Sequence, residues 1–561
     1  MTFDSNNCPA TEQGNAPSSI QVTADPRSVL RGIGATFSGK LVVLGELLQN
    51  ARRAGATHVD FFVTDDVVVV QDNGCGISDF GILFSLAKSG WDQGIQEAEG
   101  PYGMGLCAAI FACKALGIMS LGKHVYAMTQ DLQDLKAVPV NDSADLGVTE
   151  FRLHDYNFGT AAHVRAYLRK LVRGFPIPVF LDGEELPRPD ALENLEVIAA
   201  SIGHVSRVTV ETDALATYYL QGLPIHVWEG HHDLVHTSKS VVHLDPTAFK
   251  GRMPDRAYLV DAESASKTIT EELRALRISF LEERRRVMSE EAFCAEHYGE
   301  ALKLGMKDLL NSLSRFPGHW AWTFEGDPVL QQHVEDGRDY PSEDWTRDAV
   351  AKHGLMEFED YADEQEYLLC RQFVHGAGVL ATDGRAPFWH WSRAHTQSVE
   401  PYQFSWRVGN SLGSDEVMIF GTPTALCVVD KILAKWDPGD ATAEEIPLQL
   451  RPLVRAEVEI AARYDADNNV LYVTPETDPW VAARNIVTFT DSDDRHDEHV
   501  EYVTCQAIAA VRQAILSPDP VGLLRSMLDN GLPRRFPNAL KGSRFLLEFD
   551  EQGVLSVKQA T

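Results

Sequence analysis

The chain has 561 residues, of which 44% are hydrophobic and 9% aromatic, a composition typical of globular proteins. Its formal net charge of −31 disfavours binding to nucleic acid and to anionic membranes, because both depend on Lys and Arg neutralising phosphate. At about 150 residues per domain, the length predicts three or four domains.

The cysteines and the apolar runs predict a cytoplasmic protein without a membrane anchor. The eight cysteines are scattered and form no Cys-x-x-Cys pair, so the sequence indicates neither a zinc site nor a disulfide framework. No apolar run approaches the roughly 18 residues of a membrane span. The first residues carry no charged-then-apolar signal peptide, which favours a cytoplasmic location.

The stretch between Ser38 and Gly55 predicts a helix, because Ser38 can act as its N-cap, leucine and alanine recur at helical spacing, and Gly55 supplies a stop. Glu46 and Asn50 lie one turn apart and therefore project from the same face. Asn50 offers the neutral oxygen that suits Mg²⁺, and Glu46 can deprotonate a water molecule that attacks a phosphate. The alternative for this segment is a solvated polar stripe.

Two strands are predicted next, at residues 57–63 and 67–71. The second leads directly into Asp72, which is followed by Gly74 and Gly76. A carboxylate at a strand end can accept a hydrogen bond from an exocyclic amine, and glycines allow a flat ring to approach. The alternative is a tight turn, because Asn-Gly is a common turn dipeptide.

A third glycine-rich signal precedes the apolar run 106–116. Gly100, Gly103 and Gly105 would expose backbone N–H groups at the start of a helix, where phosphate binds well. The pattern is neither a dinucleotide-binding fingerprint nor a P-loop. The polar stretch 89–94 before it suits a lid over a nucleotide.

Taken in order, Glu-x-x-x-Asn, Asp-x-Gly-x-Gly and Gly-x-x-Gly-x-Gly resemble the motifs of the GHKL ATPase superfamily. That superfamily includes DNA gyrase, the ninety-kilodalton heat-shock chaperones, sensor histidine kinases and MutL proteins. The resemblance covers about residues 38–182. It implies an α/β sandwich, in which a mixed sheet is backed by helices, that binds ATP and Mg²⁺. Arg53 stands where MutL and the chaperones usually carry aspartate and where histidine kinases often carry a basic residue, so the subfamily stays open.

The resemblance also implies roles for particular residues. Glu46 would be the general base and Asn50 the Mg²⁺ ligand. Thr160 belongs to a Gly-Thr pair that we expect to precede a strand. The complete set of expected nucleotide contacts is Asn50, Asp72, Gly74, Gly76, Ile77, Gly100, Gly103, Met104, Gly105, Leu106 and Thr160.

Composition and periodicity predict five segments. These are a flexible arm at 1–26, an α/β ATP-binding domain at 27–190, a β-rich second domain at 191–262, a helical connector at 263–320 and a mixed α/β C-terminal region at 321–561. In gyrase-like and MutL-like relatives the second domain donates a lysine to the γ-phosphate, which makes Lys239 and Lys250 candidates by position.

Three further patterns favour ordinary structure over chemistry. Thr268 and Glu271 have the form of a capping box that opens a long helix. Residues 465–469 resemble part of a calcium loop but are better interpreted as a hairpin turn. The acidic cluster at 491–499 lacks nuclease spacing and is typical of a solvated loop.

The sequence therefore predicts a Mg²⁺-dependent ATPase that is chaperone-like or MutL-like. ATP would close a lid and a homodimer clamp on an unknown protein client, and the N-terminal arm would be a dimer strap or a disordered tail. One alternative is an ATP sensor that switches a partner without hydrolysis. The other is a histidine-kinase-type phosphotransferase, which needs a phosphoacceptor helix for which the short arm leaves no room.

Overall fold

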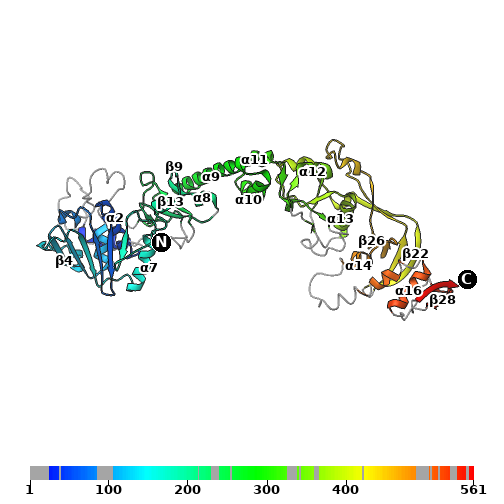
Figure 1. Ribbon diagram of the computed structural model, residues 1–561, viewed down its shortest axis with the longest axis horizontal. Coiled ribbons are helices and arrows are strands. Elements are labelled where there is room, and N and C mark those ends of the chain that lie inside the picture. The colour runs from blue at the N-terminus through cyan, green and yellow to red at the C-terminus, as the bar shows by residue number, and fades with distance from the viewer. Residues whose placement is uncertain are drawn as a thin grey trace, which may run out of the picture. The chain divides into compact units, whose positions relative to one another are not determined.

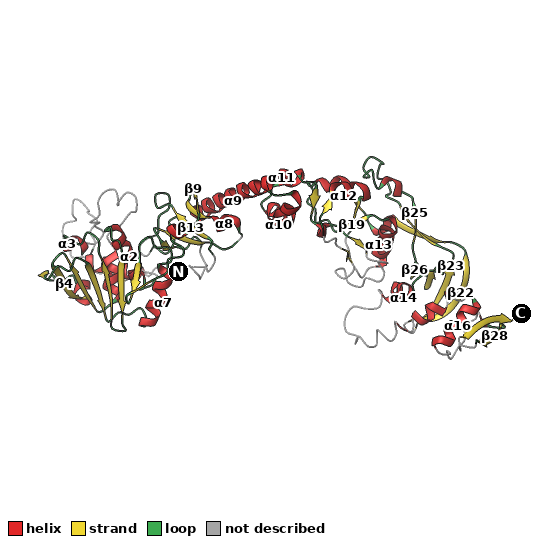
Figure 2. Cartoon of the chain, in the orientation of Figure 1, coloured by secondary structure: helices red, strands yellow, loops and turns green. Residues whose placement is uncertain are grey.

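A computed structural model describes most of the chain (Figure 1). The described residues are 25–36, 39–84, 105–212, 214–228, 239–252, 256–324, 338–339, 343–358, 365–419, 422–487, 505, 508–513, 515, 519–530, 540–550 and 555–560. The chain divides into two compact units, Met1–Phe280 and Leu281–Thr561. Both units contain helices and strands, which confirms the expected α/β class (Figure 2).

Among the described residues of the first unit, eight strands form one mixed sheet in the order β5-β4-β3-β6-β2-β1-β7-β8. The neighbouring strands β1 and β7 are parallel, and the other neighbouring pairs are antiparallel. The strands are β1 Val59–Val63, β2 Val67–Asp72, β3 Ala115–Ser120, β4 Lys123–Met128, β5 Asn141–Asp142, β6 Thr149–His154, β7 Val179–Leu181 and β8 Glu184–Glu185.

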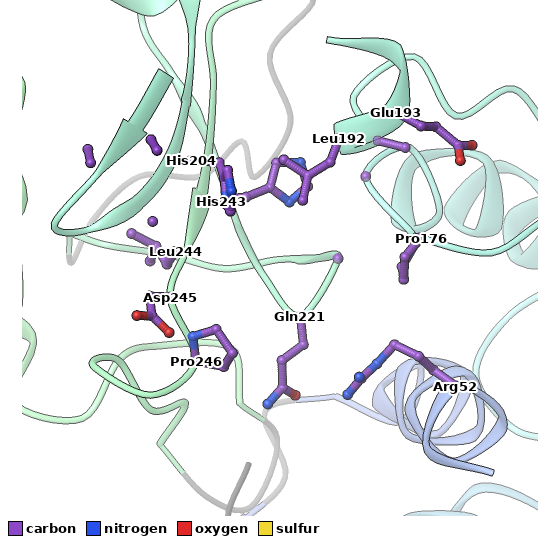
Figure 3. Close-up of a pocket in the computed structure, with 16 residues that line it drawn as sticks. Arg52, Pro176, Leu192, Glu193, His204, Gln221, His243, Leu244, Asp245 and Pro246 are labelled. Atoms are coloured by element: carbon purple, nitrogen blue, oxygen red, sulfur yellow. The ribbon is translucent and has the colours of Figure 1, made fainter. Parts of the chain in front are cut away.

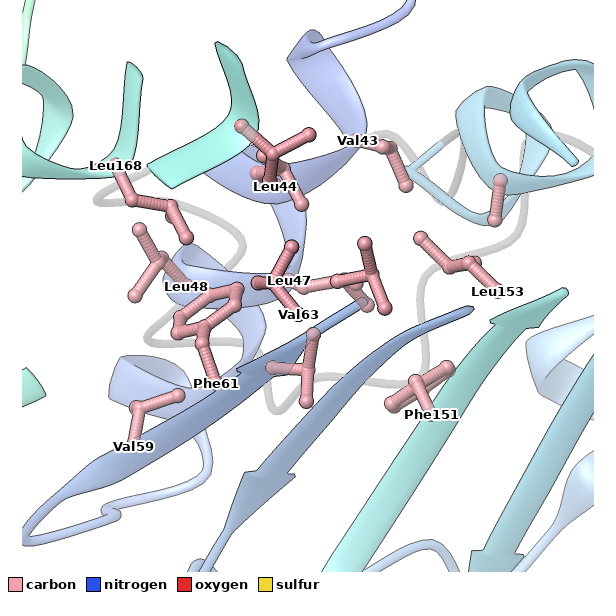
Figure 4. Packing of buried hydrophobic residues seen from close by; sticks show 14 of the residues in the cluster. Val43, Leu44, Leu47, Leu48, Val59, Phe61, Val63, Phe151, Leu153 and Leu168 are labelled. Atoms are coloured by element: carbon pink, nitrogen blue, oxygen red, sulfur yellow. The ribbon is translucent and has the colours of Figure 1, made fainter. Parts of the chain in front are cut away.

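Helices α2, α5 and α7 contribute apolar side chains to one core with this sheet. Figure 4 shows Leu47 and Leu48 of α2 above Phe61 of β1, and all three side chains are buried. The helices of this domain are α1 Pro26–Thr36, α2 Val42–Arg53, α3 Phe80–Leu83, α5 Gly105–Ala112, α6 Thr129–Gln133 and α7 Ala161–Leu171. This arrangement is the α/β sandwich that the resemblance implies.

Two local predictions for this domain are confirmed, a helix that ends before Gly55 and the two strands after it. The helix expected before Gly55 is α2, whose N-cap is Leu41 and not Ser38, and Gly55 follows it with a φ of +73°, the left-handed conformation that ends many helices. The two expected strands are β1 and β2, which form an antiparallel hairpin.

A second sheet in the first unit has the order β12-β11-β13-β10-β9 among the described residues. Its strands are β9 Val197–Ala200, β10 Gly203–Ser206, β11 Thr217–Leu220, β12 Leu223–Pro224 and β13 Val241–Leu244. The short helix α8 Arg207–Glu211 follows β10. Ile269 of the long helix α9 Ala262–Val287 is buried in the core of this sheet. We call residues 191–262 the second module.

The second unit holds several smaller sheets and helices. Its core contains large buried aromatic residues such as Trp322, Phe373 and Trp436. Its helices are α10 Glu290–Lys303, α11 Lys307–Ser312, α12 Arg347–His353, α13 Gln365–Ala377, α14 Pro479–Val487 and α16 Pro520–Asn530. None of the helices described in either unit is both long enough and apolar enough to cross a membrane.

The strands of the second unit build three sheets of three or four strands and three two-stranded sheets within the described ranges. Their bounds are β14 Arg315–Phe316, β15 Thr323–Phe324, β16 Arg338–Asp339, β17 Trp345–Thr346, β18 Leu355–Glu357, β19 Leu380–Thr382, β20 Thr396–Ser398, β21 Phe404–Val408, β22 Ser411–Ile419, β23 Thr422–Val429, β24 Ile432–Trp436, β25 Glu457–Glu459, β26 Ala462–Asp465, β27 Val470–Val473, β28 Arg544–Phe549 and β29 Leu555–Ala560.

One boundary prediction in the connector is wrong. Helix α9 begins at Ala262, so Thr268 lies inside it rather than at its start, and its hydroxyl donates to the carbonyl oxygen of Ser264. A capping pattern within a longer helical segment carries no information about where the helix starts. The hairpin prediction at 465–469 is confirmed, because β26 and β27 pair across it. The acidic cluster at 491–499 lies outside the described residues.

Candidate functional site

Helix α2 places Glu46 and Asn50 where the sequence predicts them, one turn apart on the same helix. Glu46 is buried at 7% exposure, whereas Asn50 is half-buried. The buried Arg53 follows one turn later, and its Nη1 lies 3.5 Å from Oδ1 of Asn50. This face of α2 is therefore largely withdrawn from solvent and is not a solvated polar stripe. It combines one carboxylate, one amide and one guanidinium.

Asp72 is the last residue of β2, and its carboxylate is buried. Its Oδ1 accepts a hydrogen bond from the backbone N–H of Gly74 at 2.9 Å. Burial raises the pKa of the Asp72 carboxyl above its ordinary value, although the Gly74 hydrogen bond opposes this. A carboxyl group in this setting can accept a hydrogen bond from a ligand amine that replaces its lost hydration.

The turn after Asp72 is fastened to the end of α2. The N–H of Cys75 donates to the carbonyl oxygen of Ala54 at 2.9 Å. A Cβ on Gly74 would lie 2.6 Å from the Cβ of Ala54, so only glycine fits this contact. Gly76 has a φ of +81°, which also favours glycine. These contacts hold the strand end and the helix together whether or not a purine lies on the turn.

Two buried hydroxyls support the same turn from the neighbouring strands. The N–H of Ile77 donates to Oγ of Ser120 at 2.9 Å, and Ser120 Oγ lies 3.0 Å from Oγ1 of Thr149. Thr149 is the first residue of β6 and pairs in register with Asp72. Thr149 is therefore a buried polar residue beside the candidate purine contact, which the sequence analysis missed.

The expectation that the Gly-Thr pair ending at Thr160 precedes a strand is wrong. Thr160 is the N-cap of helix α7, and its Oγ1 accepts from the backbone N–H of His163 at 3.3 Å. The side chain is exposed, whereas Thr149 is 4% exposed. A threonine after glycine is a common signal for both a helix start and a strand start, and here the helix start explains it.

Only the end of the third glycine-rich segment lies within the described residues. Gly100, Gly103 and Met104 lie outside the described residues. Gly105 and Leu106 form the first turn of α5, which packs against α2 through the apolar core. The backbone N–H groups at the start of α5 therefore belong to the same layer as Glu46 and Asn50.

A cation from the second module reaches the candidate general base. Nε of Arg256 lies 3.6 Å from Oε1 of Glu46, and both side chains are at most 15% exposed. Of the two lysines that were candidates by position, Lys250 donates its Nζ hydrogen to the carbonyl oxygen of Pro246. Arg256 was not predicted, because it is separated from Glu46 by about two hundred residues and no local motif marks it.

The donor set around α2 suits Mg²⁺. This ion keeps most of its water and takes one or two protein oxygens together with substrate phosphates. The Oδ1 atom of Asn50 is such an oxygen, and an amide oxygen has two lone pairs, so the contact with Arg53 leaves one for a metal. No group of three or more His, Cys, Asp or Glu side chains in the described residues could hold a metal alone.

Comparison with known protein families supports the assignment of this domain. Residues 39–159 match the family model described as histidine kinase-, DNA gyrase B- and HSP90-like ATPase. A search of curated proteins finds no match to the chain. The matched range contains Glu46, Asn50, Asp72 and Thr149 and ends immediately before Thr160.

Proposed function

We propose that this chain, whose residues 39–159 form a GHKL-type ATPase domain that binds ATP, hydrolyses ATP with the help of Mg²⁺, which Asn50 would hold. The observation that carries the proposal is the junction of α2 with the Asp72 turn. There the Cys75–Ala54 hydrogen bond joins the strand end that carries Asp72, which would bind the purine, to the helix that carries Asn50 and Glu46, which would serve the metal and the attacking water.

Binding would use the strand end and the start of α5. The Asp72 carboxylate would accept a hydrogen bond from the exocyclic amine of adenine, with Thr149 and Ser120 holding the adjoining turn. Gly74, Gly76 and Ile77 would lie beneath the ring. The glycine-rich segment with Gly100, Gly103, Met104, Gly105 and Leu106 would supply backbone N–H groups to the phosphates.

Hydrolysis would use Glu46 as the general base. A water oxygen forms a bond to the γ-phosphorus while Glu46 accepts a proton from that water. The bond between the γ-phosphorus and its bridging oxygen breaks, and the electron pair leaves with ADP. Bound Mg²⁺ would neutralise charge on the phosphate oxygens.

Arg256 would have two states in this scheme. Without nucleotide it forms the ion pair with Glu46 that the structure shows. With ATP present, the γ-phosphate carries more charge than one carboxylate and would draw the guanidinium away, leaving Glu46 able to accept a proton. This gives the second module the phosphate-sensing role for which Lys239 and Lys250 were candidates.

The same proposal includes the conformational changes that ATP would cause in the rest of the chain. ATP would close a lid and a homodimer in the cytoplasm, and the second module and α9 would pass the state of the site to a region that acts on a protein client. This role is chaperone-like or MutL-like in kind. The ion pair with Arg256 also favours a second candidate, an ATP sensor without turnover, because a base that stays paired with a guanidinium cannot accept the proton of water.

A steady-state phosphate-release assay separates the two functions. We expect turnover of Mg²⁺-ATP by the natural chain and a loss of at least about a hundredfold in Glu46→Ala, the scale of a general base. The affinity of that variant for a non-hydrolysable ATP analogue should be retained. If the natural chain released phosphate no faster than Glu46→Ala, the hydrolytic role would be wrong and the ATP sensor would be the remaining function.

A further inference from the structure

A hairpin of the second module is pressed against the ATPase domain at its turn. Strands β11 and β12 are joined by Gln221 and Gly222, whose φ angles of +55° and +82° suit a two-residue hairpin turn. A Cβ on Gly222 would lie 2.5 Å from Cδ of Pro176, so only glycine fits there. Figure 3, a view of the cavity beside this turn, shows the side chain of Gln221 on the same side as Arg52 of α2.

The tip of this hairpin contacts α2 at two positions that are one helical turn apart. A Cβ on Gly45 would lie 3.4 Å from Cδ1 of Leu223, and Nε2 of Gln49 donates to the carbonyl oxygen of Gln221 at 3.1 Å. Glu46 and Asn50 directly follow Gly45 and Gln49, and each step along the helix is a rotation of about 100°. The hairpin therefore holds α2 by the side next to the one that carries the proposed catalytic groups.

The body of the hairpin is also fixed to the ATPase domain. The hydroxyl of Tyr219 in β11 donates to Oδ2 of Asp190 at 2.6 Å, and both residues are buried. Arg173 donates to the same carboxylate through Nε at 2.8 Å and Nη2 at 2.9 Å, a bidentate and therefore strong contact. With its body and its tip both anchored, the turn cannot slide along α2.

The side chain of Gln221 reaches the cation that pairs with the proposed base. Nη1 of Arg256 donates to Oε1 of Gln221 at 3.5 Å, a long hydrogen bond. Nε of the same guanidinium lies 3.6 Å from Oε1 of Glu46 and has no hydrogen-bond partner among the described residues. One end of the guanidinium is thus held by a neutral amide, and the other end faces the base.

The backbone of Arg256 is itself in an unusual conformation. Its φ is +55°, in the left-handed region that non-glycine residues seldom adopt. A Cβ on Gly251 would lie 2.8 Å from the Cβ of Arg256, so a glycine makes room for this conformation. Strained backbone of this kind persists only where surrounding contacts fix it, and it is concentrated at functional sites.

A neutral acceptor suits a cation that has to change partners. The amide oxygen of Gln221 can hold a guanidinium without cancelling its charge, whereas a carboxylate at this place would compete with phosphate. The contact at Nη1 can therefore persist while Nε of Arg256 turns from Glu46 to the γ-phosphate.

We propose that Gln221 is a positioning residue, the pivot on which Arg256 turns between Glu46 and the γ-phosphate. The Gln221 carbonyl fixes the turn to α2 through Gln49, and the Gln221 amide oxygen holds Nη1 of Arg256. The distance from the cation to the base is then set by the helix that carries the base. This inference rests on the proposed role of Arg256 and adds a residue that touches neither nucleotide nor metal.

Two variants test the pivot. Gln221→Asn is too short to reach Arg256, but asparagine tolerates the left-handed backbone, whereas Gln221→Met keeps the length and removes the acceptor. Calorimetric titration gives the affinities for a non-hydrolysable ATP analogue and for ADP, both with Mg²⁺. Their ratio reports the contact with the γ-phosphate and needs no turnover. We expect this ratio to fall at least threefold in both variants, with the affinity for ADP unchanged and kcat at least threefold lower.

Three controls separate positioning from general support of the fold. In an Arg256→Ala background, Gln221→Asn should lower the ratio no further, because the two residues act through one contact. Gln130→Asn, the same substitution at an exposed glutamine of α6, should leave the ratio unchanged. In urea unfolding, Gln221→Asn should be at least as stable as the natural chain, since its turn conformation is easier for asparagine.

The outcomes distinguish failure of the pivot from failure of the proposed function. If Arg256→Ala lowers the ratio and the Gln221 variants do not, the positioning role is wrong and the role of Arg256 stands. If Arg256→Ala leaves the ratio unchanged, the proposed role of Arg256 is wrong and the pivot is wrong with it. An equal loss from Gln221→Asn in the natural chain and in Arg256→Ala would place the effect elsewhere and also overturn the pivot.

Discussion

Arg256 of the second module lies with its Nε 3.6 Å from Oε1 of Glu46, so a buried cation from outside the ATPase domain contacts the proposed general base. Both groups are largely withdrawn from water, where an ion pair is stronger than on the surface but each charge is costly alone. The second module is thereby tied to the residue that would perform the chemistry.

We expect Arg256→Ala to lower kcat for ATP hydrolysis by at least about tenfold, because a cation on the γ-phosphate stabilises the charge of the transition state. The affinity for ADP, which lacks that phosphate, should change little. The measurement is phosphate release together with calorimetric titration of ADP. Arg252→Ala is the matched control, because Arg252 lies in the same module over the ring of Tyr258. Equal effects of both substitutions on kcat would contradict this role.

Thr149 and Thr160 make a second matched pair. Thr149→Val removes a hydroxyl that supports the turn after Asp72, and we expect ATP affinity to fall about fivefold, the scale of one hydrogen bond of about 1 kcal/mol. Thr160→Val removes the N-cap of α7 and should cost about 1 kcal/mol of stability without weakening ATP binding. Isothermal calorimetry and urea unfolding measure the two effects. If only Thr160→Val weakens ATP, the family threonine is Thr160 after all.

The second unit should lose stability in acid through His390. Burial lowers the pKa of His390 to about 4, and its Nε2 and Nδ1 face Tyr298 and Ser392. Because the unfolded chain takes up a proton near pH 6.5 and the folded chain does not, stability falls as pH drops from 6.5 towards 4. Between pH 6.5 and 5 the loss is about 2 kcal/mol.

Tryptophan fluorescence reports this transition, since the His390 ring contacts Trp320 and Trp391. His390→Asn keeps a side chain that can cap the turn but does not titrate, so the slope of stability against pH should flatten. His353→Asn is the control at an exposed histidine and should leave the slope unchanged. A slope that is the same in all three proteins would rule out His390 as the cause.

The parts of the site that were predicted from sequence are local ones. The spacing of Glu46 and Asn50 follows from helical periodicity, and the ends of α2 and β2 follow from Gly55 and the valine run. In each case neighbouring residues alone decide the backbone conformation. The spacing alone does not distinguish a catalytic site from a solvated polar stripe. The resemblance to the family favours the catalytic site.

The parts that were missed depend on contacts between distant segments. Arg256 and Gln221 are brought to α2 by packing of the second module, and no pattern near either residue indicates this. The choice between Thr149 and Thr160 needs the sheet order, because only the pairing of β6 with β2 places one of them beside Asp72. The capping pattern at Thr268 failed because α9 already begins at Ala262, so Thr268 is an interior residue of the helix.

The central claim is that the buried Asp72 carboxylate holds the purine, and one calorimetric titration tests it most directly. A non-hydrolysable ATP analogue with Mg²⁺ is titrated into the natural chain and into Asp72→Asn, which keeps the size of the side chain and can still accept the Gly74 hydrogen bond. We predict binding to the natural chain and at least tenfold weaker binding to the variant. Absence of binding to the natural chain, or equal affinity in both proteins, would contradict the claim.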